Sequence, residues 1–93
     1  MTWIKTVPLS QAGDELRRAL ESARAVYPKE YSTPVFKTDD GISAIVASHS
    51  LIPGALYHAF STFGVLMSPE LALTRRQHEM ITTMVSVTNR CFY

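Results

Sequence analysis

The sequence predicts an all-α protein, and three observations carry that prediction. Apolar residues recur at helical spacing in four separate stretches, which is the primary signal of amphipathic helices. One of those stretches opens with Thr74-Arg75-Arg76-Gln77, which matches the capping box of a helix start. The composition, 46% hydrophobic and 18% charged, is that of a chain that folds. With 93 residues, positions 1–93 form one small domain or part of a larger one, and two independent cores are excluded.

The first helix is predicted to run from Ser10, a plausible N-cap, to about Tyr27, where Pro28 ends it. An extended segment, residues 1–9, precedes this helix, and a loop to about Asp40 follows it. The apolar face that this helix is expected to bury comprises Leu16, Ala19, Leu20, Ala23, Val26 and Tyr27.

The next two helices lie in residues 41–69, which contain no Asp, Glu, Lys or Arg. A short helix is expected over residues 42–49, capped by Asp39 or Asp40, and a longer one begins at Pro53 and ends before Ser68-Pro69. An uncharged helical pair in so small a chain is expected to be buried on most sides, which implies a neighbouring subunit or missing sequence. We therefore expect a homo-oligomer. The residues expected at or near the subunit contacts are Leu56, Phe60, Phe63 and Met80.

The fourth helix is predicted to start at the capping box and to run to about Asn89. Residues 85–88 also alternate as a strand would, but the cap and the length of 16 residues favour a helix. Its expected buried stripe comprises Met80, Ile81, Met84, Val85, Val87 and Thr88. The residues assigned to its other face are Glu79, Thr82, Thr83, Ser86 and Arg90.

Charge and motif content argue against several functions. A net charge of +1 argues against a nucleic-acid partner, and no run of about 20 apolar residues could span a membrane. A cytoplasmic location is expected, because the N-terminus has no signal-peptide core and a single cysteine forms no intramolecular disulfide. The scattered glycines form no phosphate loop. His49, His58 and His78 lack metal-pair spacing, so no cofactor or metal is predicted, and His49 and His58 are expected to hydrogen-bond locally.

Cys91 is harder to place from the pattern alone. A lone cysteine beside an apolar helix is most often a small buried hydrophobe. A thiol that opens a new helix would instead lie at the positive end of that helix, which favours the thiolate. The sequence stops at Tyr93 before any such helix, so both interpretations of Cys91 stay open.

Two runs near the C-terminus, LTRRQHEMI at 73–81 and VSVTNRCFY at 85–93, resemble the alkylhydroperoxidase D and carboxymuconolactone decarboxylase superfamily. The likeness is to its peroxidase-related branch, and SHSLIPGAL at 48–56 and the Trp3-Ile4 lead-in share it. The resemblance covers essentially the whole chain and is strongest over the last 21 residues. It implies an antiparallel helical bundle of the alkylhydroperoxidase D-like type, of which residues 1–93 are the N-terminal portion.

The same resemblance implies two catalytic residues. Glu79, twelve positions before Cys91, matches the active-site glutamate of the family, and Cys91 matches the first cysteine of its redox pair. In the family the second thiol attacks the peroxide and the first resolves the intermediate into a disulfide. That second cysteine would fall directly after Tyr93, and a histidine would follow about one helical turn later. The alternative for Glu79 is a solvated carboxylate favoured by the helix N-terminus.

The implied function is that of a thiol- or selenol-dependent peroxidase, which reduces hydroperoxides with electrons from a dithiol or protein reductant. The alternative is a carboxymuconolactone-decarboxylase-type or non-redox helical assembly or binding protein. A UGA codon after Tyr93, read as selenocysteine, would explain a stop inside the motif; a nonsense mutation or a mispredicted gene end is the alternative. With one thiol, the 93-residue chain is expected to lack steady-state peroxidase turnover.

Overall fold

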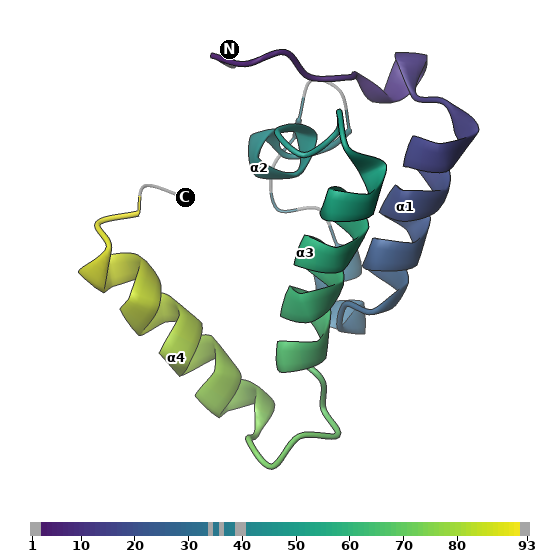
Figure 1. The fold of residues 1–93 in the computed structure, drawn as a ribbon. Helices are drawn as coiled ribbons and strands as arrows, with labels where there is room; N and C mark the ends of the chain where they lie inside the picture. Colours follow the sequence, from purple (N-terminus) through teal and green to yellow (C-terminus); the bar gives the residue numbers. More distant parts are fainter. Residues whose placement is uncertain (1–2, 34, 36, 39–40, 92–93) are drawn as a thin grey trace.

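A computed structural model describes residues 3–33, 35, 37–38 and 41–91 of the chain. These residues form helices without any strand, as predicted (Figure 1). Two short 3₁₀ helices, η1 and η2, occur near the N-terminus and after the first α-helix. The bounds are η1 Leu9–Gln11, α1 Asp14–Ala25, η2 Lys29–Ser32, α2 Ala44–Ala47, α3 Pro53–Leu66 and α4 Arg75–Thr88.

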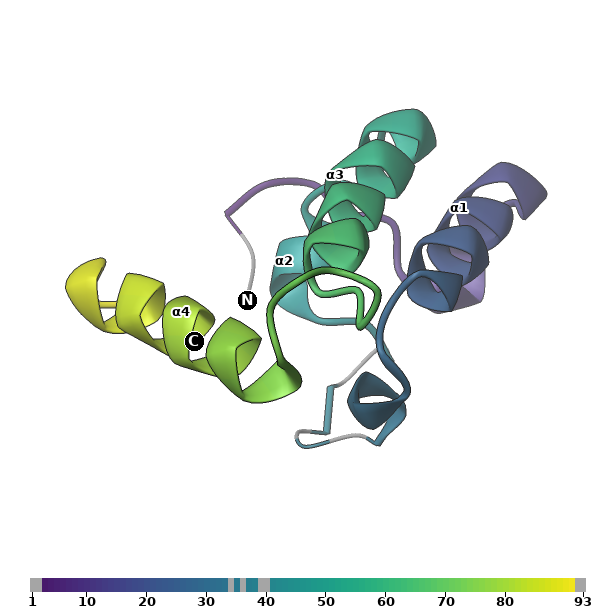
Figure 2. The same ribbon diagram turned by 90° about the horizontal axis from the view of Figure 1, so that it is seen from below.

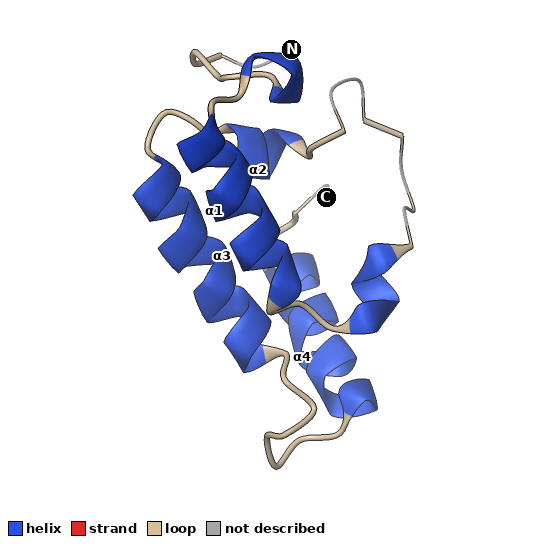
Figure 3. Cartoon of the chain, turned by 90° about the vertical axis from the view of Figure 1, so that its right-hand side faces the viewer, coloured by secondary structure: helices blue, strands red, loops and turns tan. Residues whose placement is uncertain are grey.

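Helices α1 and α3 lie side by side and form the extensive helix–helix contact of the described chain (Figures 1 and 3). Both run in the same direction, so that Val26 at the end of α1 meets Gly64 near the end of α3. The long crossover through α2 makes this parallel arrangement possible. An antiparallel arrangement, which the family resemblance implies for the bundle, is therefore not the relation between these two helices.

The hydrophobic core lies between α1, α3 and the segment that leads into α2. Leu56 of α3 is fully buried in it, at 0% exposure. Helix α1 of the same chain covers Leu56, and its expected place at or near a subunit contact stays a prediction. The buried core residues are Ala12, Leu16, Leu20, Ala23, Ile42 and Leu56, with Val7, Leu9, Ala19, Val46, Ala47 and Phe60 packed against them.

Helix α1 begins later than predicted. Gly13, not Ser10, is its N-cap residue, because residues 9–11 form the separate turn η1. The Arg17 guanidinium donates to the carbonyls of Leu9 and Ala12, each at 3.0 Å, and so ties η1 to the first turns of α1. Helix α2 is likewise shorter than predicted, with Ser43 as its N-cap residue. The caps expected at positions 39 and 40 lie outside the described residues.

The boundaries of α3 and α4 agree with the prediction. Pro53 is the first residue of α3, where its missing N–H costs nothing. The capping box of α4 is complete: Gln77 N–H donates to Thr74 Oγ1 at 3.3 Å, and Thr74 N–H donates to Gln77 Oε1 at 2.8 Å. Asn89 is the C-cap residue of α4.

Helix α4 diverges from the α1–α3 pair, so the described chain is open (Figures 1 and 2). Its accessible surface is 7585 Å², whereas a compact monomer of this mass would expose about 5,400 Å². Its radius of gyration is 14.1 Å, against about 12 Å for a compact domain of this length. No helix among the described residues is long and apolar enough to cross a membrane.

Two surfaces that the sequence predicts to be buried, by a neighbouring subunit or by further sequence, are exposed in the single chain, so their burial stays a prediction. The uncharged helical pair is not buried on most sides: Leu51, Ile52, Phe63, Val65 and Leu66 are exposed. The predicted buried stripe of α4 is also exposed, with Met84 at 62% and Val87 at 65%. Helix α4 instead turns its polar side toward its own chain. The buried or half-buried residues of that side are Arg75, His78, Glu79, Thr82 and Ser86.

Candidate functional site

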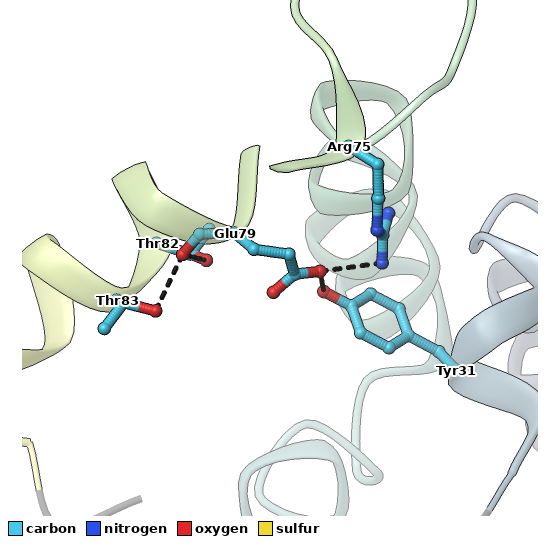
Figure 4. Close-up of polar contacts among 5 residues, drawn as sticks. All are labelled: Tyr31, Arg75, Glu79, Thr82 and Thr83. Atoms are coloured by element: carbon cyan, nitrogen blue, oxygen red, sulfur yellow. Dashed lines mark hydrogen bonds and ion pairs between the residues drawn. The ribbon is translucent and has the colours of Figure 1, made fainter. Parts of the chain in front are cut away.

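Glu79 lies in the second turn of α4, and two side chains hold its carboxylate (Figure 4). Arg75, one turn earlier, forms an ion pair with Glu79 Oε1 at 2.8 Å. Tyr31 of η2 donates its hydroxyl to the same oxygen at 3.0 Å. The contact joins residues 48 positions apart in sequence and ties α4 to the segment that follows α1.

Aromatic rings extend this contact toward the α1–α3 pair. The Arg75 guanidinium lies over the Tyr31 ring, 4.7 Å from its centroid, in cation–π geometry. The Tyr31 and Tyr27 rings pack edge-on with their centroids 6.1 Å apart, and the Tyr27 and Phe63 rings pack edge-on with their centroids 5.9 Å apart. Phe63 belongs to α3. Glu79 is therefore positioned by a chain of packed side chains that reaches α3.

The protonation of Tyr31 fits its role as a donor. Burial raises the pKa of Tyr31, and the hydrogen bond that it donates to Glu79 raises that pKa further. The phenol therefore keeps its proton throughout the neutral pH range. Because Arg75 and Tyr31 both bind Oε1 of Glu79, the second oxygen, Oε2, has no partner among the described residues. It is an open hydrogen-bond acceptor.

The hydroxyls beside Glu79 are turned back onto their own helix (Figure 4). Thr82 and Thr83 donate to the Glu79 carbonyl at 3.1 and 2.7 Å. Bonds of this kind to the preceding turn are common for threonine within helices. Neither hydroxyl therefore competes for the Glu79 carboxylate.

Cys91 lies just beyond the other end of α4, and it is exposed. Its N–H donates to Ser86 O at 2.8 Å, and the N–H of Arg90 donates to Val87 O at 3.0 Å. Arg90 has φ +50°, so these two bonds form a Schellman motif with a left-handed residue that is usually glycine. The exposure of the thiol shows that the interpretation of Cys91 as a buried hydrophobe is wrong.

The structure does not bring the two predicted catalytic residues together. Glu79 precedes Thr88, the last residue of α4, by nine positions, which is about 14 Å along a helix axis. The ion pair with Arg75 could have been inferred from the i, i+4 spacing of the two residues. Tyr31 carries no such signal, since it comes from a distant turn.

The three histidines have different environments. The His49 Nδ1 atom lies 2.9 Å from the Ile45 carbonyl oxygen, which confirms its expected local hydrogen bond. His58 is exposed and contacts the Tyr57 ring instead. His78 is 4% exposed, and neither of its ring nitrogens has a hydrogen-bond partner among the residues that the structure describes. Within the described part of the chain, no group of three or more His, Cys, Asp or Glu side chains could hold a metal ion.

Comparison with known proteins identifies no relative of this chain: no family model, curated protein or solved structure matches it. The functional assignment therefore depends on the residues described above. Among them, Glu79 supplies a carboxylate fixed through one oxygen, and Cys91 supplies an exposed free thiol.

Proposed function

We propose that residues 1–93 are the N-terminal part of a thiol- or selenol-dependent peroxidase of the alkylhydroperoxidase type. In this proposal Glu79 and Cys91 are the chain's share of the active site, and the four helices belong to the bundle of that family. The substrate is a hydroperoxide, and a dithiol or protein reductant supplies the electrons. The observation that supports it best is the carboxylate of Glu79, fixed through Oε1 and open at Oε2.

The proposed reaction has two steps at the redox pair. A thiolate or selenolate, supplied by the position after Tyr93, attacks the hydroperoxide, so that the O–O bond breaks and an alcohol leaves. The resulting sulfenic or selenenic acid condenses with the Cys91 thiol, which releases water and forms a disulfide or selenenylsulfide. The reductant then returns both groups to their reduced form. The exposure of Cys91 suits both the condensation with the sulfenic or selenenic acid and the later attack by the reductant, since each step needs access to the Cys91 sulfur or its partner.

Glu79 is proposed to act through a histidine that follows the second redox residue. Its open Oε2 would accept the N–H of that imidazole, whose other nitrogen would remove the proton from the nucleophile. Arg75 and Tyr31 hold the carboxylate in one orientation and so limit its rotamers. Positioned general-base help of this sort is worth about 10²–10⁴-fold in rate.

The decisive experiment is a peroxidase assay on the complete gene product. Glu79→Gln should lower turnover at least about tenfold, because the amide no longer provides a charged acceptor to the histidine. It should also raise the apparent pKa for alkylation of the nucleophile. Glu70→Gln is the matched control: it makes the same change at an exposed carboxylate outside the helices and should leave both readouts unchanged. If Glu79→Gln alters stability alone, Glu79 is a structural carboxylate and its catalytic role is refuted.

The 93-residue polypeptide supplies a second test. It should show no steady-state peroxidase turnover in the presence of dithiothreitol, because the attacking thiol or selenol and the histidine of the proposed mechanism both lie outside residues 1–93. Turnover that Cys91→Ser abolishes would contradict the two-residue mechanism. The nucleotide sequence after the Tyr93 codon should read as cysteine or as UGA, with a histidine codon about one helical turn later.

A second candidate is a helical assembly or binding protein without redox turnover. The exposed apolar side of α4 favours it, since monomeric proteins rarely expose contiguous apolar surface of this kind. The two candidates differ in their dependence on Cys91. A complete protein that has no peroxidase activity, and that assembles normally as Cys91→Ser, would support the assembly protein.

A further inference from the structure

The Glu79 carboxylate receives one of its two bonds from a distant part of the chain (Figure 4). The Tyr31 hydroxyl donates to Glu79 Oε1 at 3.0 Å, across 48 positions of sequence. The ion pair of Arg75 with the same oxygen is local to α4, because the two residues are one helical turn apart. Of the two donors, Tyr31 alone relates the carboxylate to a segment outside its own helix.

The Tyr31 ring is itself held in place. The Arg75 guanidinium lies over the ring, 4.7 Å from its centroid, and the Tyr27 ring packs against it edge-on. A tyrosine side chain has two torsions, so contacts on the ring also fix the direction of the hydroxyl. An arginine side chain has more rotamer freedom, and a solvent-exposed ion pair restricts it little. The phenol is therefore the more rigid of the two donors.

The direction of the hydroxyl decides which carboxylate oxygen stays open. The last torsion of a glutamate is broad, so a carboxylate that is not held turns and its two oxygens exchange places. Tyr31 binds Oε1 from a fixed position, which leaves Oε2 as the acceptor for a further donor. Arg75 by itself can follow either oxygen, because its side chain is long and belongs to the same helix.

We infer that Tyr31 is a positioning residue for the Glu79 carboxylate, and that this carboxylate is correctly oriented only while α4 lies against η2. The inference rests on the proposed peroxidase function, because it requires Glu79 to act on a histidine that follows the redox pair. It goes further in making the active site conditional on a contact between two segments that are distant in sequence. Tyr31 acts through Glu79 and not on the peroxide itself.

The contact can be tested in the 93-residue chain without any activity. Burial, and then the hydrogen bond to Glu79, raise the pKa of Tyr31. Glu79→Gln should therefore lower the pKa of Tyr31, so that tyrosinate absorbance appears at lower pH, and should cause no such change in a Tyr31→Phe background. Equal titration curves of the wild type and Glu79→Gln would overturn the inference, since Tyr31 would not contact the carboxylate.

Peroxidase assays on the complete gene product test the positioning role. Tyr31→Phe removes the hydroxyl and keeps the ring that packs against Arg75 and Tyr27. It should lower turnover about three- to tenfold, the factor that corresponds to one hydrogen bond. It should also raise the apparent pKa for alkylation of the nucleophile, and circular dichroism should show unchanged helix content because the lost bond is exposed. Tyr57→Phe is the matched control: it removes a hydroxyl from α3, where the ring packs against His58, and should change neither readout.

The double variant separates failure of the inference from failure of the proposed function. In a Glu79→Gln background, Tyr31→Phe should have no further effect on turnover, because Tyr31 acts through that carboxylate. If Glu79→Gln lowers turnover and Tyr31→Phe does not, the inference is overturned and the proposed function stands. The same conclusion follows if Tyr31→Phe lowers turnover equally in both backgrounds. If Glu79→Gln leaves turnover and alkylation unchanged, the proposed role of Glu79 fails, and the inference fails with it.

Discussion

Gly64 of α3 lies against Val26, the C-cap residue of α1, and Gly64→Ala tests this close contact. A Cβ atom at this position would lie 2.9 Å from Val26 Cβ, and 3.1 and 3.2 Å from the carbonyl carbon and oxygen of Val26. Carbon atoms in favourable contact are about 3.5–4.0 Å apart, so the contacts with Val26 Cβ and with the Val26 carbonyl carbon are too short. Truncation of the Val26 side chain would not relieve them, since two of the three atoms are backbone.

The change that Gly64→Ala makes in the free energy of unfolding follows from two opposing effects. Overpacking a well-packed contact costs about 1–3 kcal/mol. Replacing glycine by alanine within a helix gains about 0.8–1 kcal/mol. The backbone of Val26 is fixed by the hydrogen bond from its N–H to the Ala23 carbonyl, so the two helices must separate to make room. We therefore expect a net loss of up to about 2 kcal/mol in the free energy of unfolding.

Thermal and urea denaturation measure this loss, and the same helix provides the control. A loss of this size should lower the Tm by up to about 10 °C in a domain of this length. Gly54 also lies in α3 but has open space where its Cβ would be, so Gly54→Ala should raise the Tm by about 2–4 °C. Both variants must be compared at one protein concentration, because association shifts the Tm. If both substitutions raise the Tm alike, the close approach of α1 and α3 is refuted.

Two further predictions concern titration and backbone conformation. Burial raises the pKa of both Tyr27 and Tyr31 above 10.0 in the folded state, so the unfolded chain loses these protons first. The free energy of unfolding should therefore be fully retained below pH 10 and should fall as the pH rises beyond it. Urea denaturation at about pH 9 and about pH 11 measures this fall, and an equally steep fall in Tyr27→Phe/Tyr31→Phe would contradict it. Arg90→Gly should stabilise the protein by about 0.5–1 kcal/mol, because glycine adopts the left-handed conformation of Arg90 without steric cost. Arg90→Ala should give no such gain in urea denaturation, and equal effects of the two substitutions would count against a left-handed residue at this position.

The parts of the fold that could be predicted are those with local signals. Pro53 is the first residue of α3, and the capping box of Thr74 and Gln77 lies at the start of α4, so the neighbouring residues alone specify both helix starts. Ser10 satisfies the same local criteria as an N-cap, yet α1 begins at Asp14. Residues 9–11 instead form η1, and Arg17 donates to the carbonyls of Leu9 in that turn and of Ala12 just after it. No residue pattern specifies this turn, so the later start of α1 could not be predicted.

The periodicity of α4 revealed its two faces but not their environments. The pattern places Met80 and Met84 on a buried stripe of the helix, but burial also needs a neighbouring element, and both side chains are exposed in the single chain. The site shows the same limit. The spacing of Arg75 and Glu79 predicts their ion pair, but no pattern connects Glu79 to Tyr31 in η2.

The attachment of α4 to the rest of the chain has a consequence for cooperativity. His78 is the one fully buried residue among the described positions of α4, and the Tyr31–Glu79–Arg75 contacts are open to solvent. Ion pairs of such exposure contribute little free energy, so α4 can undock while Leu56 and the α1–α3 core stay folded. Amide protons in α4 should then exchange with solvent through a low-energy local opening, and those in α1 and α3 only through global unfolding. A denaturation midpoint would accordingly report on the core, and only a local probe on α4 would tell whether the Glu79 carboxylate is in place.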